Sequence, residues 1–154
     1  MTPDLSIRIT RVSDSDPTVA LPSYATAGSA GADVRANLPN RTLITLGPGE
    51  RASIPTGLCM EIPPGYEVQV RPRSGLALKH GIALVNAPGT IDSDDRGPVG
   101  VILLNTGDVP FVVDHGSRIA QLVVAPVVQA SFDLTDGLTD SARGGGGFGS
   151  TGQS

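Results

Sequence analysis

The chain has 154 residues, 39% of them hydrophobic, with a formal net charge of −4 at pH 7 and a pI of about 4.9. This length fits one domain that buries roughly two-thirds of its unfolded surface. The acidic balance argues against a nucleic-acid partner, and two tyrosines, three phenylalanines and no tryptophan leave few rings for stacking bases.

A membrane partner and an oxidising compartment are also not expected. No segment has the roughly 20 apolar residues that a membrane-spanning helix needs, and the first residues lack the pattern of a secretory signal. The single cysteine, Cys59, excludes an internal disulfide and fits a reducing environment. We therefore expect a cytoplasmic protein.

Glycine (20) and proline (13) are spread along the chain and separate short runs rich in Val, Ile and Thr. This pattern is typical of an all-β sandwich or barrel, with turns at 47–49 and 63–65. The predicted strands are, in chain order, Ser6–Val12, Thr42–Leu46, Arg51–Ile54, Leu58–Ile62, Tyr66–Arg71, Ile82–Leu84, Val99–Asn105, Phe111–Val113 and Ile119–Val128.

One short helix is predicted over Ser74–His80. Ser74 is a good N-cap, Gly81 is a typical stop, and two basic residues in the last turn suit the helix dipole. The start of this helix, beside Arg73, offers unpaired amides to an anion.

After Phe132 the composition changes. Residues 133–140 are acidic and polar, and six glycines follow between Arg143 and Gly152. We therefore expect a folded domain over 1–132 and a flexible glycine-rich C-terminal arm over 133–154 that closes over a ligand. A glycine-rich arm is costly to order, but its arginine suits anionic oxygens and Phe148 suits a flat ring.

Five segments together carry a resemblance. They are 30–33 (Ala-Gly-Ala-Asp), 72–77 (Pro-Arg-Ser-Gly-Leu-Ala), 86–97, 116–121 (Gly-Ser-Arg-Ile-Ala-Gln) and the arm. In order and spacing the chain resembles the homotrimeric all-β dUTP pyrophosphatases (dUTPases) from about residue 30 to residue 152. The resemblance implies a jelly-roll-like fold, a homotrimer, and active sites at subunit contacts with the arm supplied by a neighbour.

The resemblance also implies the chemistry. Asp92 is the catalytic base that orients and deprotonates water, since a fixed carboxylate within hydrogen-bonding reach serves that purpose. From the residues alone, an Asx-turn aspartate is the alternative. Ser74 is a catalytic stabiliser of the leaving group, or only a helix cap. Arg143 is catalytic as it reaches the γ-phosphate, much as an arginine finger does.

Substrate binding is implied for a larger group. The Asn86–Asp92 segment reads as a hairpin in which Asn86 pairs with the uracil edge and main-chain groups exclude a 5-methyl group. Phe148 stacks on uracil, Arg73 contacts phosphate, and Gln121 contacts phosphate or the water shell. The full substrate-binding set is Arg73, Ser74, Gly75, Asn86, Gly89, Thr90, Ile91, Asp92, Gln121, Arg143, Phe148, Gly149 and Ser150.

Mg²⁺ is the implied cofactor. Mg²⁺ grips phosphate oxygens and keeps several waters, and the sequence has no dense ligand cluster for a protein cage. We expect Asp33 to contact the metal indirectly, through water.

The chain departs from the family pattern at Asp95, where the resemblance implies a tyrosine packed on the deoxyribose, and at Pro98, where an acidic residue is usual. An aspartate supplies no stacking surface. Either the sugar is discriminated elsewhere, or the enzyme is slow or poorly selective against UTP; Asp94 and Asp95 could also recruit a cation.

The predicted function is hydrolysis of dUTP to dUMP and pyrophosphate. This reaction limits uracil incorporation into DNA and supplies dUMP for thymidylate synthesis. The alternatives are a nucleotide sensor of the same fold with weak or no catalysis, and a dCTP deaminase-like enzyme.

Overall fold

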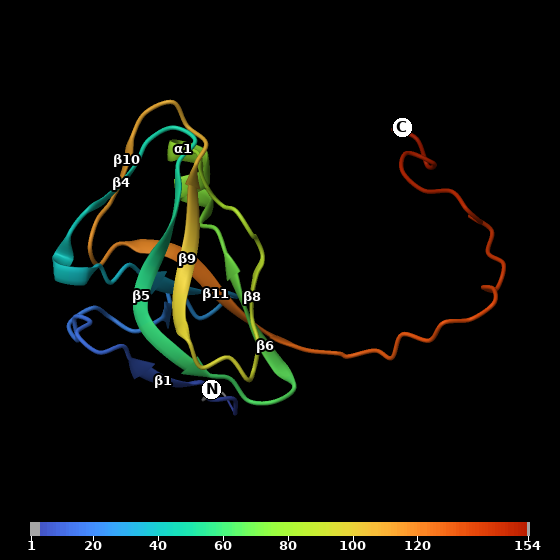
Figure 1. Cartoon of the computed structure of the whole chain (residues 1–154), viewed down its shortest axis with the longest axis horizontal. Helices are drawn as coiled ribbons and strands as arrows, with labels where there is room; N and C mark the ends of the chain where they lie inside the picture. The colour runs from blue at the N-terminus through green and yellow to red at the C-terminus, as the bar shows by residue number, and fades with distance from the viewer. Residues whose placement is uncertain (1–3, 154) are drawn as a thin grey trace.

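The computed structural model describes residues 4–153 and places two antiparallel β-sheets face to face (Figure 1). One sheet has the order β1 (Arg8–Arg11), β5 (Arg51–Glu61), β9 (Pro98–Asn105), β7 (Ile82–Leu84). The other has the order β2 (Ser23–Tyr24), β3 (Ala32–Arg35), β11 (Arg118–Pro126), β6 (Tyr66–Arg71), β8 (Gly89–Ile91). A separate pair joins β10 (Phe111–Val113) to β4 (Ile44–Leu46), and the helices are η1 (Pro39–Arg41) and α1 (Ser74–His80).

The core lies between the two sheets because their strands alternate inward and outward residues. On β9, Val99, Val101 and Leu103 are buried while the residues between them are more exposed. From the opposite sheet, Val34 and Val68 enter the same cluster. The prediction of an all-β fold with one short helix is confirmed. Over residues 4–153, no helix is long and apolar enough to cross a membrane.

Strand β5 is one strand where the sequence predicts two, Arg51–Ile54 and Leu58–Ile62. Gly57 has a positive φ of 70°, and the pairing register with β9 shifts between Pro55 and Cys59. This irregularity interrupts the pairing with β9 without ending the strand. Gly57 also makes room for a buried amide, because a Cβ there would lie 2.9 Å from Nδ2 of Asn37.

Strands β2, β3 and β8 are absent from the sequence prediction. Strand β3 is Ala-Asp-Val-Arg, whose central aspartate and surrounding small residues are unfavourable for a strand. It forms because both of its neighbours, β2 and β11, pair with it. This tertiary pairing is what places Asp33 inside the sheet.

The Asn86–Asp92 segment is not a hairpin, contrary to the prediction. Strand β7 before it pairs with β9 in one sheet, and strand β8 at its end pairs with β6 in the other. The segment crosses between sheets because Ile91 is buried in the core and Gly89 packs closely on β6. A Cβ on Gly89 would lie 3.2 Å from Cβ of Val70.

The predicted helix Ser74–His80 is confirmed, and Gly81 ends it in the left-handed conformation with a φ of 67°. Ser74, however, is the first helical residue and not the N-cap. Arg73 occupies the cap with extended backbone, and no side chain caps the helix. The other end is fixed to the loop after β9, where the Thr106 hydroxyl donates to the Gly81 carbonyl at 2.6 Å.

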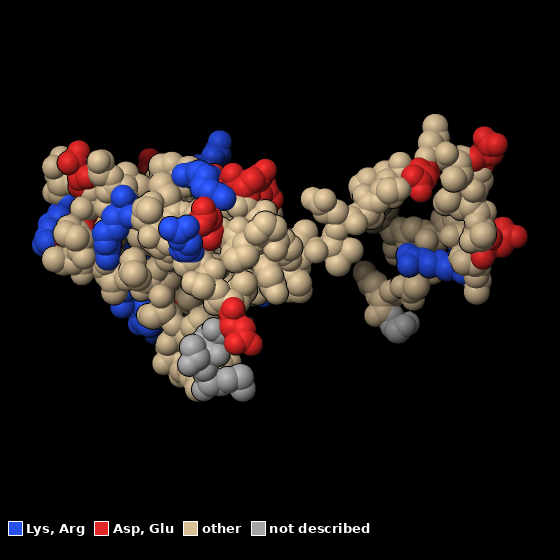
Figure 2. Space-filling view, turned by 90° about the horizontal axis from the view of Figure 1, so that it is seen from below, with Lys and Arg blue, Asp and Glu red and all other residues tan. Residues whose placement is uncertain are grey.

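After β11 the chain leaves the body (Figure 1). Val127 donates its N–H to the Gly65 carbonyl at 2.9 Å, and beyond it the described residues up to 153 form no strand or helix. The side chains of Phe132, Leu138 and Phe148 are almost fully exposed. Basic and acidic side chains are interspersed on the body, whereas acidic side chains predominate on the extension (Figure 2).

Candidate functional site

Three neighbouring strands bring an aspartate, a glutamine and two arginines together. Gln121 on β11 is paired in register with Asp33 on β3 and with Arg71 on β6. One carboxylate oxygen of Asp33 lies 3.2 Å from Nη1 of Arg118, and the other lies 3.6 Å from Nε of Arg73. The Gln121 amide donates to this second oxygen at 3.4 Å. We call these four residues, Asp33, Arg73, Arg118 and Gln121, the Asp33 cluster.

The cluster has more positive than negative charge. The Asp33 side chain is only 9% exposed and orients two guanidinium groups, whereas Arg73 and Arg118 are 25% and 44% exposed. Each guanidinium has five N–H donors in a planar fork, so contact with one carboxylate leaves donors facing solvent. Such a pair of held arginines is suited to the oxygens of a phosphate chain.

The donor set does not fit a direct protein cage for a cation. Both oxygens of Asp33 already face guanidinium groups, which would repel a metal ion. Within the described part of the chain, no three His, Cys, Asp or Glu residues are grouped to hold a metal. Water-mediated contact between Asp33 and a metal stays a prediction.

A second group of predicted site residues lies on the segment that crosses between the sheets. Asn86 is exposed, and its amide sits over Gly89, where a Cβ would come within 3.2 Å of Nδ2. Asp92 follows β8, is exposed, and accepts the Asp95 N–H on its carbonyl at 3.2 Å. Asp92 also lines a surface cavity of about 650 Å³, together with Tyr66, Glu67, Asp94 and Gln129.

Asp92 and Arg73 follow opposite ends of β6, whereas Asn86 precedes Gly89, the partner of Val70, and so lies on the Arg71 side. Ile91 is paired with Val68 near the start of the strand, whereas Arg73 and Ser74 follow its end at Arg71. At about 3.3 Å per residue, the steps from Val68 to Arg71 alone span about 10 Å. Asp92 lies beyond Ile91 in the direction away from Arg71, so one chain does not bring Asp92 to the arginines.

Arg143 and Phe148 are also not brought to the other residues in this chain. The Arg143 guanidinium donates to the arm's own carbonyls at Gly146 and Gly147, at 2.9 and 3.3 Å. The remaining predicted contacts differ in exposure: Gly75, Thr90, Gly149 and Ser150 are exposed, whereas Gly89 and Ile91 are buried.

Arg118 is the member of the Asp33 cluster that is not among the predicted site residues. It sits next to Gln121 in the Gly-Ser-Arg-Ile-Ala-Gln motif, but by residue type it reads as structural. It lies where the pairing of β11 with β3 is irregular, between Arg118 and Ala120. The motif was the available signal, whereas the irregular pairing at this point is not visible in the sequence.

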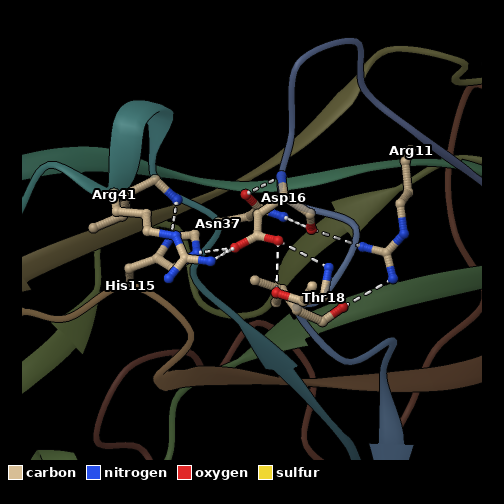
Figure 3. A network of polar contacts seen from close by, with 8 residues as sticks. Arg11, Asp16, Thr18, Asn37, Arg41 and His115 are labelled. Atoms are coloured by element: carbon tan, nitrogen blue, oxygen red, sulfur yellow. Dashed lines mark hydrogen bonds and ion pairs between the residues drawn. The ribbon is translucent and has the colours of Figure 1, made fainter.

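The most perturbed carboxyl group belongs to Asp16, in the loop after β1 (Figure 3). One of its oxygens accepts from the Thr18 hydroxyl at 2.6 Å and from the Thr18 N–H at 2.9 Å. The other accepts from His115 Nε2 at 2.9 Å and from Arg41 at 2.8 Å. The Thr18 hydrogen bonds, then those of His115 and the charge of Arg41, hold the pKa of Asp16 well below its ordinary value.

This network is structural, because none of its members belongs to the predicted site. Asp16 also exchanges two backbone hydrogen bonds of 3.0 Å with the Asn37 amide, just after β3. The Leu38 N–H donates to Nδ1 of His115 at 2.9 Å, so the ring proton faces Asp16 on Nε2. The network ties the N-terminal loop to the end of β3 and to the turn before β11.

The fold and the Asp33 cluster define an all-β protein in which a buried carboxylate orients two partly exposed arginines. The chain belongs to the dUTPase family, whose model matches residues 18–152. A protein of Roseobacter denitrificans named deoxyuridine 5'-triphosphate nucleotidohydrolase is 63% identical, with 96% of this chain and 97% of the relative covered. A protein of the same name from Anaeromyxobacter is 56% identical, with coverages of 97% and 99%.

Solved structures agree on the fold. The dUTPase of Staphylococcus bacteriophage 80alpha, crystallised with dUpNHpp, superposes with a TM-score of 0.84 at 23% identity and covers 96% of this chain and 99% of its own. The dUTPase of phage phi11 of S. aureus superposes with a TM-score of 0.74 at 20% identity, with coverages of 86% and 97%.

Replacing Asp16 by Asn should lower the melting temperature at neutral pH. Because its pKa is lowered in the folded protein, the carboxylate stabilises the fold fully above its ordinary pKa of about 3.8, and less as the pH falls below that value. The difference between wild type and Asp16→Asn should therefore shrink from pH 5 to pH 2.5. Thermal melts of both proteins, with the exposed Asp108→Asn as control, measure it; a constant difference would contradict the assignment.

Proposed function

We propose that this chain hydrolyses dUTP to dUMP and pyrophosphate in the cytoplasm. It is a dUTP diphosphatase, which limits uracil incorporation into DNA and supplies dUMP for thymidylate synthesis. The family match over residues 18–152 carries this conclusion. The geometry supports it, since the chain offers an arginine cluster for phosphates and a separate segment for the base.

The triphosphate binds beside the Asp33 cluster. Arg73 and Gln121 contact non-bridging oxygens, with Gly75 nearby at the start of α1. The Ser74 hydroxyl lies by the bridging oxygen and donates to it as charge develops there. The fixed, partly exposed guanidinium of Arg73 supports this role, because a held donor needs little reorganisation when charge appears.

The uracil binds against the segment that crosses between the sheets. Asn86 pairs its amide with the base edge, and the main chain of Gly89, Thr90 and Ile91 leaves no room for a 5-methyl group. The position of the Asn86 amide directly over Gly89 supports a fixed orientation for this pairing.

Asp92 accepts a proton from water, and that water attacks the α-phosphorus. The bond from this phosphorus to the bridging oxygen breaks, so the products are dUMP and pyrophosphate. The proton remains first on the carboxylate and then passes to solvent. No covalent nucleophile is required, because positioning and charge stabilisation account for most phosphoryl-transfer catalysis.

The C-terminal arm closes the site. Phe148 stacks on the uracil, Arg143 reaches the γ-phosphate, and Gly149 and Ser150 bind alongside it. In the chain as described Phe148 is exposed and Arg143 contacts carbonyls of the arm itself, which supports contact with another subunit or closure on binding.

We further propose that the protein is a homotrimer whose sites lie between subunits. The distance along β6 between Asp92 and the Asp33 cluster supports this arrangement, since one chain does not form a whole site. A neighbouring copy supplies the missing half by symmetry.

Mg²⁺ is the proposed cofactor, and the triphosphate would bring it to the site. Its chemistry is the neutralisation of charge on the triphosphate, and the ion keeps several waters when bound to phosphate oxygens. The phage phi11 dUTPase structure is described as coordinating a structural Mg(II) ion. In this chain, Asp33 would contact such an ion through water, and it would also orient the two arginines beside it.

A sensor with weak or no catalysis is the second candidate, and Asp95 is the observation that favours it. Its carboxylate accepts the Gly97 N–H at 2.8 Å, so it braces its loop and presents no ring to a sugar. A dCTP deaminase-like activity has less support, because the relatives are named nucleotidohydrolases.

Asp92→Asn should lower dUTP turnover about a thousandfold or more while the affinity for dUpNHpp stays within about threefold, since only the base is removed. Pyrophosphate release with Mg²⁺ from dUTP, dTTP, dCTP and UTP, and calorimetric binding of the analogue, measure this. Asp94→Asn serves as the neighbouring control. Tight binding by wild type without pyrophosphate release would favour the sensor, and unchanged turnover in Asp92→Asn would remove it as the base.

Asp95→Tyr should raise the preference for dUTP over UTP about tenfold, because a ring packed on the sugar leaves no space for a 2'-hydroxyl group. The ratio of kcat/KM for the two nucleotides gives the result directly. An unchanged ratio would show that the sugar is read by other residues.

A further inference from the structure

The loop of residues 92–97, which begins with Asp92, has little regular backbone pairing. It connects β8 in one sheet to β9 in the other, so its two ends lie in different sheets. Two of its backbone N–H groups have partners within the loop: Asp95 donates to the Asp92 carbonyl and Gly97 to the Asp95 carboxylate. A connection of this kind needs side-chain contacts to remain in one conformation.

Arg96 supplies such contacts within the loop. Its Nη1 donates to the Ser93 carbonyl at 2.7 Å and to the Asp95 carbonyl at 3.2 Å. The guanidinium group therefore links two carbonyl groups of the loop backbone. Its other terminal nitrogen, Nη2, lies 3.7 Å from an oxygen of Glu61, outside the loop.

Glu61 connects the loop to strand β5. It is the last residue of β5, paired in register with Arg8 of β1, and Arg8 donates to its second carboxylate oxygen at 3.1 Å. Strand β5 also pairs with β9 through Cys59 and Pro98, so Glu61 lies beside the point where the loop enters β9. Each oxygen of the Glu61 carboxylate thus faces one arginine, one from the sheet and one from the loop.

We propose that Glu61 is a positioning residue for Asp92, acting through Arg96; this inference rests on the proposed role of Asp92. A general base works only within hydrogen-bonding reach of its water, and a misplacement of about 1 Å costs up to about a hundredfold in rate. Both side chains of the pair are about half exposed. Such ion pairs contribute little to global stability, so the effect should fall on turnover and on loop order.

The test compares Glu61→Gln, Arg96→Met and the double variant with wild type. We expect kcat for dUTP to fall about fivefold in Glu61→Gln, and further in Arg96→Met, with KM within about twofold. The double variant should match Arg96→Met, because both changes break one chain of contacts. Arg8→Gln is the matched control: it removes the other partner of Glu61, leaves Arg96 in place, and should keep kcat near wild type.

Hydrogen exchange at the Asp95 and Gly97 amides gives a readout that does not depend on activity. Exchange should be faster in Glu61→Gln and Arg96→Met than in wild type and Arg8→Gln. Unchanged exchange in Glu61→Gln, or additive losses of kcat in the double variant, would overturn the inference. If wild type releases no pyrophosphate from dUTP, the proposed function fails, while the exchange rates still decide whether Glu61 holds the loop.

Discussion

The pairing of β6 with β11 on one side and β8 on the other fixes where the charged groups of this protein lie. Through β11, the end of β6 meets Asp33 and Gln121, so Arg73 leaves the sheet beside a buried carboxylate. Through β8, the start of β6 meets Ile91, so Asp92 leaves the sheet at the opposite end. Because antiparallel register is set by which side chains must be buried, neither end can move without exposing core residues.

The Asp33 cluster illustrates how a buried charge serves a site. Removing a carboxylate from water is costly unless cations and hydrogen-bond donors surround it. Here two arginines and one amide do so, and in return the guanidinium groups are oriented while keeping free donors. An isolated surface arginine would lose conformational entropy on binding a phosphate, whereas these are already partly ordered.

Much of this arrangement was predictable from the sequence, but the separation of Asp92 from the Asp33 cluster was not. The alternating runs, the Ser74–His80 helix and the five motifs indicated an all-β dUTPase, and the family match confirms it. The sequence does not predict strand β3, because its strand character comes from its neighbours and not from Ala-Asp-Val-Arg itself. Pro88 and Gly89 are turn residues and predict a hairpin over Asn86–Asp92, yet burial of Ile91 carries this segment to the other sheet. Linear motifs give the order of site residues along the chain. Only the strand pairing tells at which end of a strand each residue lies.

The central claim is that Asp92 and Arg73 act together only across two chains, and subunit complementation tests it most directly. Asp92→Asn and Arg73→Gln, each inactive alone, would be unfolded together in equal amounts and refolded as mixed oligomers. If a site takes Asp92 from one subunit and Arg73 from another, about one quarter of wild-type turnover of dUTP should return, because that share of interfaces pairs two intact contributions. No recovery in mixtures shown by mass spectrometry to contain both chains would contradict the account, since it would place both residues of a working site in one chain.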